Sequence, residues 1–420
     1  MRPDESPTTL TNWAGNITFR PAELRHPTTV DEVRTAITTA STVRVLGTGH
    51  SFSPIADTSG TLISLARMPE VIEVDSARRL VRVSAATRWG DLARVVAKHN
   101  LGLHTMGSLP HISVAGSVAT GTHGSGSRAG CLATAVRALT LVSADGSDMR
   151  IDVGDAHFEG SVVALGALGV VTELELELTD YYEVEQTVWL DIPLRTAIDQ
   201  IDTILDSARS VSLFTTWATD MVEQVWVKRD VAEPDVSLAW CGGRPAETPC
   251  HPLPGIAAVA CTTQLGQPGP WNERVPHFRA DLTPSSGHEL QTEFMVARTH
   301  ARAALDALTS IASIIAPVVQ ISEIRSVASD SLWMSPFEGR ESVCLHFTWV
   351  PSMTNVLPAL AAVERVLEPY AARPHWGKVF TMTPATLRDL YPRLNDFTAL
   401  RDHFDPRRVM SNAMLDAYLP

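Results

Sequence analysis

T-M-G-S-L-P-H-I-S-V-A-G-S-V-A-T-G-T-H-G-S-G-S-R-A-G, residues 105–130, is the least ordinary stretch of this 420-residue chain. Glycine lets backbone amides approach a ligand closely, and the serine and threonine hydroxyls add neutral donors. A flexible Gly/Ser-rich linker would be the alternative. However, Ile112, Val114 and Val118 are interspersed as in a buried segment. The stretch therefore predicts an ordered, packed cradle for a pyrophosphate or a flat ring.

A second glycine-containing motif, G-T-G-H-S-F at residues 47–52, directly follows a predicted strand at residues 43–46. It is not G-x-G-x-x-G leading into a helix, and no acidic residue stands where a Rossmann unit binds ribose, so a nicotinamide site is disfavoured. Taken alone, a histidine after a strand is usually a packed or capping residue. Upstream, Thr29 and Glu32 form a capping box that predicts a helix ending near Ser41.

Outward from these motifs, short strands alternate with amphipathic segments up to Tyr181, where the pattern changes. The length favours two domains, with a boundary near residue 181. The expected strands are 61–65, 71–74, 80–84, 138–142, 170–178, 223–227, 290–296, 318–322 and 343–350, and the expected helices are 89–99, 194–208 and 301–315. The Pro/Gly/Cys-rich stretch 241–276 is expected to be a long surface excursion.

Polar pairs stand opposite apolar residues on two of these strands. Strand geometry puts Glu323 and Arg325 on one face, and His346 and Thr348 repeat the arrangement on a nearby strand. A cross-strand ion-pair ladder on a solvated sheet is one interpretation. We favour a single sheet whose polar face lines a cavity. A third motif, His375-Trp376-Gly377-Lys378, would be interpreted as a surface turn if it stood alone.

Charge and composition exclude several classes of function. The net charge of −13 repels nucleic acids and anionic membranes. Five scattered cysteines without a C-x-x-C pair favour neither a disulfide framework nor a zinc site, and no metal is expected. The N-terminus lacks the apolar core of a signal peptide, and no run is long enough for a spanning helix, so we expect a cytoplasmic protein. Without an aromatic stripe or heptad, a monomer is the default expectation.

Taken together, these motifs resemble the vanillyl-alcohol-oxidase-type flavoproteins, within them the alditol oxidases and sugar-lactone oxidases, over essentially the whole chain. The resemblance implies a two-domain α+β fold. Residues 1–180 would form an FAD-binding domain of two small α/β subdomains, residues 181–378 a substrate (cap) domain with an antiparallel sheet flanked by helices, and residues 379–420 would return to the first domain.

The resemblance also implies the cofactor and its attachment. In that family a histidine at the position of His50 is bonded covalently to the 8α-methyl of FAD. A second bond from a cysteine is not expected, because the nearest cysteine, Cys131, follows the glycine run. The residues implied to contact FAD are Leu46, Gly47, Thr48, Gly49, His50, Ser51, Phe52, Gly107, Ser108, His111, Ile112, Ser113, Gly116, Ser117, Thr120, Gly121, His123, Gly124, Val170, Val171 and His375.

On the substrate side, the match implies a polyol site made by Ser108, Glu323, Arg325, Thr348 and Lys378. A polyol offers only hydroxyls, and this set supplies both donors and acceptors. Arg325 and Lys378 are expected to stabilise a developing alkoxide, and the proton would go to His346 or Lys378. The expected activity is oxidation of a terminal alditol hydroxyl, as in xylitol or sorbitol, with dioxygen as acceptor. An aldonolactone oxidase or dehydrogenase is the alternative, and a non-catalytic flavin- or carbohydrate-binding protein is a weaker one.

Overall fold

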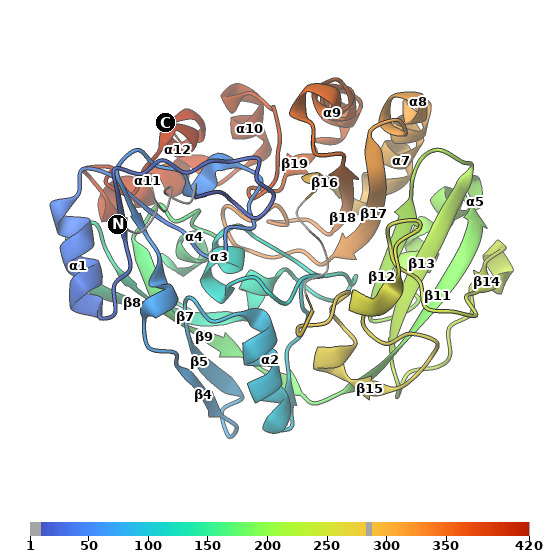
Figure 1. Cartoon of the computed structure of the whole chain (residues 1–420), viewed down its shortest axis with the longest axis horizontal. Coiled ribbons are helices and arrows are strands. Elements are labelled where there is room, and N and C mark those ends of the chain that lie inside the picture. Colours follow the sequence, from blue (N-terminus) through green and yellow to red (C-terminus); the bar gives the residue numbers. More distant parts are fainter. Residues whose placement is uncertain (1–9, 283–287, 420) are drawn as a thin grey trace, which may run out of the picture.

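The structure is a computed structural model that describes residues 10–282 and 288–419. The opening residues, predicted to lack a signal peptide, therefore lie partly outside the described residues. Within the described residues, no helix is both long and apolar enough to cross a membrane. Figure 1 shows the N-terminal elements on one side of the molecule and a large twisted sheet on the other.

The N-terminal part contains two small sheets. A parallel three-stranded sheet has the order β1 (Glu23–Arg25), β3 (Thr61–Ile63), β2 (Val43–Val45). An antiparallel five-stranded sheet has the order β4 (Ile72–Asp75), β5 (Leu80–Ser84), β9 (Val170–Glu177), β7 (Val136–Val142), β8 (Asp148–Asp152). Buried and half-buried residues alternate along β9, which confirms the predicted strand with one wetter face.

Four helices accompany these sheets, namely α1 (Val30–Thr39), α2 (Trp89–Lys98), α3 (Val114–Ala119) and α4 (Phe158–Val162). The Thr29 side chain caps α1 by accepting from the Glu32 amide, as the sequence predicts. The Glu32 carboxylate accepts from the amide of Thr28, one residue before the cap. A two-stranded ladder of β6 (Leu101–Gly102) and β10 (Thr179–Asp180) precedes the change of architecture.

The second part is built on a nine-stranded sheet. Its path is β14 (Arg244–Pro245), β11 (Glu183–Pro193), β13 (Met221–Asp230), β12 (Ser210–Thr215), β17 (Val319–Val327), β18 (Ser342–Trp349), β16 (Leu290–Ala297), β19 (Arg373–Pro374), with β15 (Gly269–Pro270) beside β11. The helices on its apolar side are α5 (Leu194–Asp199), α6 (Ile201–Leu205), α7 (Ala301–Ser310), α8 (Ala312–Ile315) and α9 (Met353–Leu367). The two predicted long helices are thus each divided in two.

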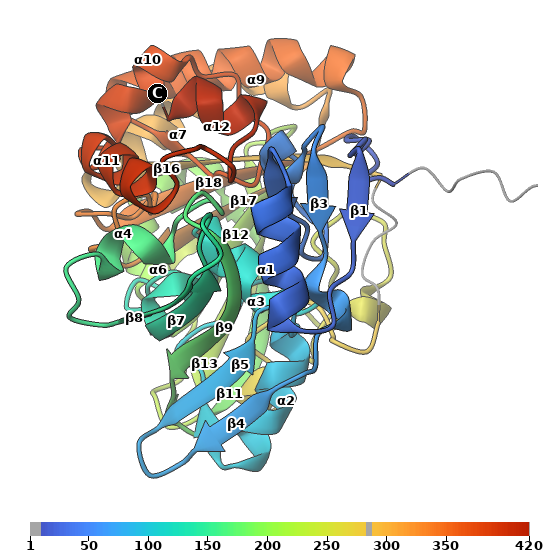
Figure 2. The same cartoon turned by 90° about the vertical axis from the view of Figure 1, so that its left-hand side faces the viewer.

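The C-terminal residues fold back onto the N-terminal part. Helices α10 (Pro384–Leu390), α11 (Leu394–Phe404) and α12 (Ala413–Tyr418) contribute buried side chains to the same core as α2, β5 and β7. Figure 2 shows α11 next to α4, and α12 next to α10. The buried Arg44 strengthens this closure, because its guanidinium donates to the carbonyls of Ile55, Leu165, Gly166 and Met410.

The prediction for residues 241–276 is only partly right. The stretch has the expected short, irregular elements, and several of its side chains are exposed, Val259 most of all. However, Trp271 is fully buried, and its indole donates to the carbonyl of Leu101 in the N-terminal part. His251 and Leu253 line the cavity described below. The stretch is therefore a wall between the two parts of the molecule rather than a surface excursion.

Candidate active site

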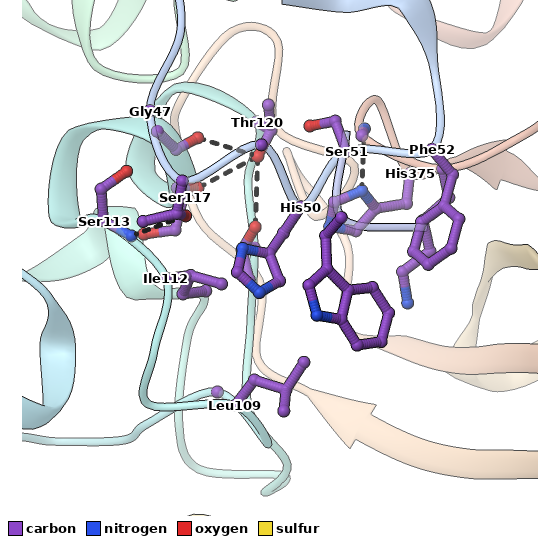
Figure 3. A pocket seen from close by; sticks show the side chains of 18 of the residues that line it. Gly47, His50, Ser51, Phe52, Leu109, Ile112, Ser113, Ser117, Thr120 and His375 are labelled. Atoms are coloured by element: carbon purple, nitrogen blue, oxygen red, sulfur yellow. Dashed lines mark hydrogen bonds between the residues drawn. The ribbon is translucent and has the colours of Figure 1, made fainter. Parts of the chain in front are cut away.

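A cavity of about 500 Å³ lies where the first loop (residues 46–52) and the second loop (residues 105–130) meet the polar face of the large sheet. The imidazole of His50 projects among side chains of both loops, including Ile112 (Figure 3). Most of the predicted site residues line this one cavity, namely Leu46, Gly47, Thr48, Gly49, His50, Ser51, Phe52, Gly107, Ser108, Ile112, Ser113, Gly116, Ser117, Thr120, His123, Val171, Glu323, Arg325, His346, Thr348, His375 and Lys378.

Four predicted cofactor contacts do not line the cavity. Val170 points into the apolar core because side chains alternate along β9, which leaves Val171 on the cavity side. Gly121 and Gly124 lie behind the second loop, where an added Cβ would come within 2.9 Å of Pro336 and 2.4 Å of a backbone oxygen. His111 is half-buried, and the backbone of residues 280 and 282 lies against its ring. For these four positions, contact with FAD stays a prediction.

The first loop is held by a tight set of contacts. Gly49 has a φ of +69°, a conformation that glycine adopts without strain, and its carbonyl accepts from the amide of Trp13 at 2.8 Å. The Trp13 indole stacks on the His50 ring with 5.5 Å between centroids. His50 Nδ1 is buried without a hydrogen-bond partner among the described residues. Burial, together with His111, lowers the pKa of His50 to about 4, so the ring is neutral at pH 7.

Close packing of the two loops depends on glycines that have no side chain. A Cβ at Gly47 would lie 2.6 Å from Ser113 Oγ, and one at Gly116 would lie 2.8 Å from the same atom. The amide of Ser113 is 3.3 Å from Thr48 Oγ1, so the loops also contact each other directly. This arrangement fits FAD, whose pyrophosphate and flat ring need exposed backbone and hydroxyl groups. Cys131 is buried outside the lining, with its thiol against Asp330.

The motif at residues 375–378 is not a surface turn. His375 and Trp376 are buried, and the Gly377 carbonyl accepts from the amide of Phe52 at 2.7 Å. His375 Nδ1 accepts from the Gly377 amide at 3.0 Å. Burial, and next the charge of Lys378, keep the pKa of His375 well below its usual value. The motif thus joins the first loop to the large sheet and places Lys378 in the cavity.

The polar face of the large sheet is defined by six residues on three adjacent strands. Glu293 on β16, His346 on β18 and Glu323 on β17 stand in one cross-strand row. In a second row, Thr348 on β18 lies between Gln291 on β16 and Ile321 on β17. Arg325 follows Glu323 by two residues along β17 and therefore shares its face. On the opposite face, Ile324, Leu345 and Phe347 are buried in the apolar core, as predicted. The interpretation that this polar face lines a cavity is therefore confirmed, and the alternative of an ion-pair ladder on a solvated sheet is not.

Glu293, which is not among the predicted site residues, binds both predicted cations. Its Oε1 lies 2.6 Å from Arg325 Nη2 and its Oε2 lies 2.8 Å from Lys378 Nζ. Oε1 is also 3.2 Å from His123 Nε2, and the side chain is only 1% exposed. Burial alone would raise the pKa of Glu293, but Lys378, His123 and Arg325 lower it well below its usual value. The two cations are therefore already paired before a substrate arrives.

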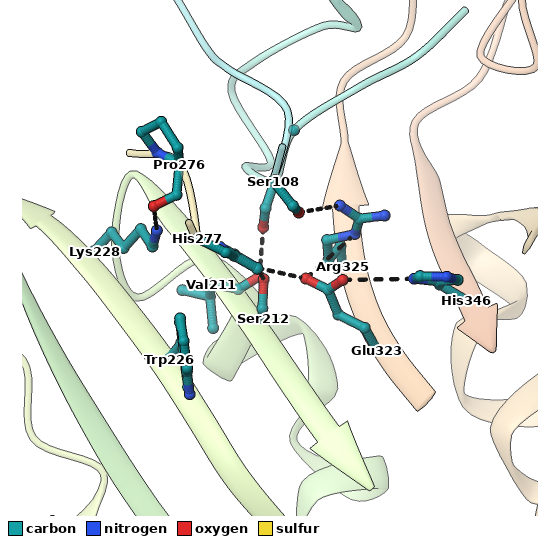
Figure 4. A network of polar contacts seen from close by, with 12 residues as sticks. Ser108, Val211, Ser212, Trp226, Lys228, Pro276, His277, Glu323, Arg325 and His346 are labelled. Carbon is teal, nitrogen blue, oxygen red and sulfur yellow. Dashed lines mark hydrogen bonds and ion pairs between the residues drawn. The ribbon is translucent and has the colours of Figure 1, made fainter. Parts of the chain in front are cut away.

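Glu323 and His346 complete the polar face (Figure 4). Glu323 Oε2 is 3.6 Å from His346 Nδ1, and Arg325 Nη1 is 3.4 Å from Ser108 Oγ. Although burial opposes it, Arg325 and His277 lower the pKa of Glu323, so it stays ionised. Burial and the charge of Lys378 lower the pKa of His346 to about 4, and both of its ring nitrogens lack a hydrogen-bond partner among the described residues.

A signal for Glu293 was present in the sequence. Glu289, Gln291 and Glu293 alternate with Leu290 and Thr292, which is the period of two that identified Glu323 and Arg325. Two other cavity residues, Trp13 and His277, lie in segments without periodicity. Pattern reasoning could not have placed them.

Comparisons with known proteins agree with this geometry. A family model described as FAD binding domain matches residues 21–152, and one described as D-arabinono-1,4-lactone oxidase matches residues 288–418. An alditol oxidase from Streptomyces sp. is 48% identical over 97% of this chain and 98% of that protein. The L-gulono-1,4-lactone dehydrogenase of Mycobacterium tuberculosis is 27% identical over 96% of each.

Among solved structures, the cholesterol oxidase from B. sterolicum superposes with a TM-score of 0.79 over 100% of this chain and 99% of that one, at 14% identity. At this identity the likeness concerns the fold alone. The architecture is the expected two-domain α+β arrangement of FAD-binding oxidases.

Proposed function

Because this chain belongs to the alditol oxidase family of FAD-binding oxidoreductases, we propose that it oxidises the terminal primary hydroxyl of an alditol such as xylitol or sorbitol. The alditol loses two electrons and two protons to become the aldose, and dioxygen takes them up as hydrogen peroxide. The observation that carries the proposal is the polar face, which brings hydrogen-bond donors and acceptors together at the cavity beside the two loops.

The cofactor is FAD, and we propose that His50 bonds covalently to its 8α-methyl. The unpartnered Nδ1 and the depressed pKa of His50 support this role, since both leave a neutral nitrogen available. When bound, FAD would supply the acceptor for the hydride of the carbinol carbon. Trp13, stacked on the imidazole, and the Phe52 amide bonded to Gly377 hold the attachment point in place.

The arrangement of the sheets along the chain supports a division into an FAD-binding and a substrate domain. We propose that residues 1–180 bind FAD, that residues 181–378 form the substrate domain, and that residues 379–420 complete the first domain. The sheets change between β10 and β11, and α10, α11 and α12 pack into the N-terminal core.

The groups that bind the polyol include both hydrogen-bond donors and hydrogen-bond acceptors. Glu323 accepts hydrogen bonds, Arg325 donates them, and the hydroxyls of Ser108 and Thr348 do both. A site that satisfies several hydroxyls rejects an alcohol lacking them, because its buried polar groups would then be left unpaired. His346 is the better candidate for the proton acceptor, because its imidazole is neutral at pH 7. Lys378, paired with Glu293, is better suited to stabilise the alkoxide.

A lactone-oxidising activity is the second candidate, because the C-terminal third matches the D-arabinono-1,4-lactone oxidase model. The two activities are separated by mixing the holoenzyme anaerobically with xylitol or with L-gulono-1,4-lactone. We expect xylitol to bleach the flavin absorbance at 450 nm quickly and the lactone slowly or not at all. The reverse order would establish the lactone activity. Bleaching by neither would contradict both and favour a binding protein.

The attachment is tested by denaturing the holoenzyme in acid. We expect the wild-type pellet to stay yellow and the His50→Ala pellet to be colourless, with free FAD in the supernatant. Colourless wild-type protein would overturn the covalent bond. His99→Ala, at an exposed position outside the cavity, is the matched control and should stay yellow.

A further inference from the structure

A buried lysine that the proposed chemistry does not use lies behind the substrate site. Lys228 on β13 is 1% exposed, and its ammonium donates to three consecutive carbonyls, those of Arg274, Val275 and Pro276, at 2.9, 2.7 and 2.7 Å. An ammonium has three protons, so all three are used. Burial lowers the pKa of Lys228, but three acceptor oxygens require the protonated form. The ammonium therefore fixes residues 274–276 against the large sheet.

The residue that follows these carbonyls reaches the polyol site. His277 is 4% exposed, and its Nε2 lies 2.8 Å from Glu323 Oε1 (Figure 4). Trp226 and Phe214 pack around the ring at centroid distances of 5.1 and 5.9 Å. The backbone on both sides of the ring is also fixed, since the Thr262 amide donates to the His277 carbonyl and the Phe278 amide donates to the Ser108 carbonyl.

The protonation state of His277 follows from its neighbours. Burial, and next the charge of Lys228, lower the pKa of His277 to about 4, and Glu323 opposes this shift without cancelling it. At pH 7 the ring is neutral. A carboxylate only accepts hydrogen bonds, so Nε2 must carry the proton and donate it to Glu323. Nδ1 is then a bare acceptor, and it has no hydrogen-bond partner among the described residues.

We propose that His277, fixed by the Lys228 ammonium, is a positioning residue that orients Glu323 for the polyol. The hydrogen bond from Nε2 occupies Oε1, which leaves Oε2, 3.6 Å from His346 Nδ1, to accept a substrate hydroxyl. His277 matters only for substrates that carry hydroxyls beyond the reacting carbon, because only these hydroxyls bind to the oriented Glu323 carboxylate. This inference rests on the proposed alditol oxidation.

The test compares two replacements of the ring. His277→Leu fills the buried position with an apolar side chain and removes the donor, whereas His277→Gln offers an amide N–H near the position of Nε2. We expect His277→Leu to raise the KM for xylitol about tenfold or more while the limiting rate of anaerobic flavin reduction changes less than threefold. His277→Gln should restore the KM to within about threefold of wild type. His99→Leu, exposed and outside the cavity, is the control.

A second readout uses substrate length. For 1-propanol, which lacks further hydroxyls, His277→Leu should leave kcat/KM within about twofold of wild type. An unchanged KM for xylitol in His277→Leu, or a Gln variant as impaired as the Leu variant, would overturn the inference. Failure of wild-type holoenzyme to be reduced by any alditol would instead overturn the proposed function, so the two failures are distinct.

The role of Lys228 is tested by combination. If Lys228 acts through His277, Lys228→Met should raise the KM for xylitol. The double variant Lys228→Met, His277→Leu should then have a KM less than threefold higher than that of Lys228→Met alone. Fully multiplicative effects would mean that the two residues act independently and would contradict the link. Should Lys228→Met fail to fold, the comparison of the Leu and Gln variants of His277 still decides the central claim.

Discussion

One carboxylate at the centre of the site, that of Glu293, pairs with two cations and favours the charged form of Lys378. Arg325 and Lys378 each contact a different oxygen of Glu293. Burial lowers the pKa of Lys378, and Glu293 is the largest influence that raises it. Glu293→Gln removes this support and keeps the shape. The pKa of Lys378 should therefore fall, and any limb of the pH–rate profile that belongs to Lys378 should move to lower pH.

The measurement is the rate of anaerobic flavin reduction by xylitol between pH 6 and 10. Because breaking a buried pair leaves uncompensated charge, Glu293→Gln should also lose about 3 kcal/mol of unfolding free energy. The control is Glu368→Gln, at an exposed position. A profile and a stability equal to those of wild type would show that Glu293 does not hold the cations.

Gly107 provides a test of the oxidase assignment. An added Cβ there would meet only ordinary van der Waals contacts, the nearest being the His123 carbonyl oxygen at 3.8 Å and Ile112 Cδ1 at 3.9 Å. Gly107→Ala therefore fits, and Gly107→Val adds further bulk where the second loop lines the cavity. We expect reoxidation by dioxygen to slow about tenfold while anaerobic reduction stays intact, with Gly107→Ala intermediate. Equal slowing of both half-reactions would contradict the assignment.

Residue-level patterns predicted part of the site for a clear reason. The period of two along a strand fixes which side chains share a face, so Glu323, Arg325, His346 and Thr348 could be placed on one side of their strands from sequence. The pairing of Glu293 with Lys378 could not, because their contact joins positions 85 residues apart. His277 was beyond pattern reasoning as well, since it lies in an irregular segment whose course depends on a buried lysine from another strand.

At the scale of elements, the N-cap of α1 offers a change that separates stability from activity. Thr29 Oγ1 accepts from the Glu32 amide, and α1 contributes no residue to the cavity lining. Thr29→Ala should cost about 1 kcal/mol in unfolding free energy, measured by urea denaturation, with turnover of xylitol unchanged. Thr39→Ala at the other end of the helix has no capping role and should cost less. An equal loss for both variants would contradict the capping argument.

Among the elements, predictions from short local patterns were more reliable than predictions for long irregular stretches. The bounds of β5 agree with the prediction, because the alternation of apolar residues that marks the strand is local, although one of its partners, β9, lies far along the chain. The 241–276 stretch was misplaced because proline, glycine and cysteine indicate an irregular backbone and not its location. Its buried contacts come from single side chains such as Trp271, whose partner Leu101 lies 170 positions away.

For the whole molecule, three buried histidines predict how stability depends on pH. The pKa values of His277 and His346 are about 4, and that of His375 is well below its usual value, chiefly through burial. Between pH 6.5 and 4 the unfolded chain binds protons at these residues and the folded protein does not. Stability is therefore full above pH 6.5 and falls as the pH drops, by about 1.4 kcal/mol per unit for each histidine. Glu293 and Glu323, whose pKa values are lowered, add to the loss below about pH 4.5.

Thermal unfolding checks this expectation. The Tm should be nearly constant from pH 8 to 7 and should fall steadily from pH 6.5 to 5, with a shallower fall in His277→Gln. A Tm at pH 5 equal to that at pH 7.5 would contradict the assignment of buried neutral histidines. Light scattering on the same samples would test the monomer prediction.

The contacts of Arg44 also have a consequence for the order in which parts of the chain come together. Its side chain is buried, with 3% of the residue exposed, and one of its acceptors, the carbonyl of Met410, lies 366 positions away in the chain. The Val43 amide likewise donates to the carbonyl of Val409. Burying a guanidinium without its acceptors costs free energy, so the strand that leads into the first loop is satisfied only when residues 409 and 410 have docked. Docking of this C-terminal segment is therefore coupled to formation of the loop that lines the cavity.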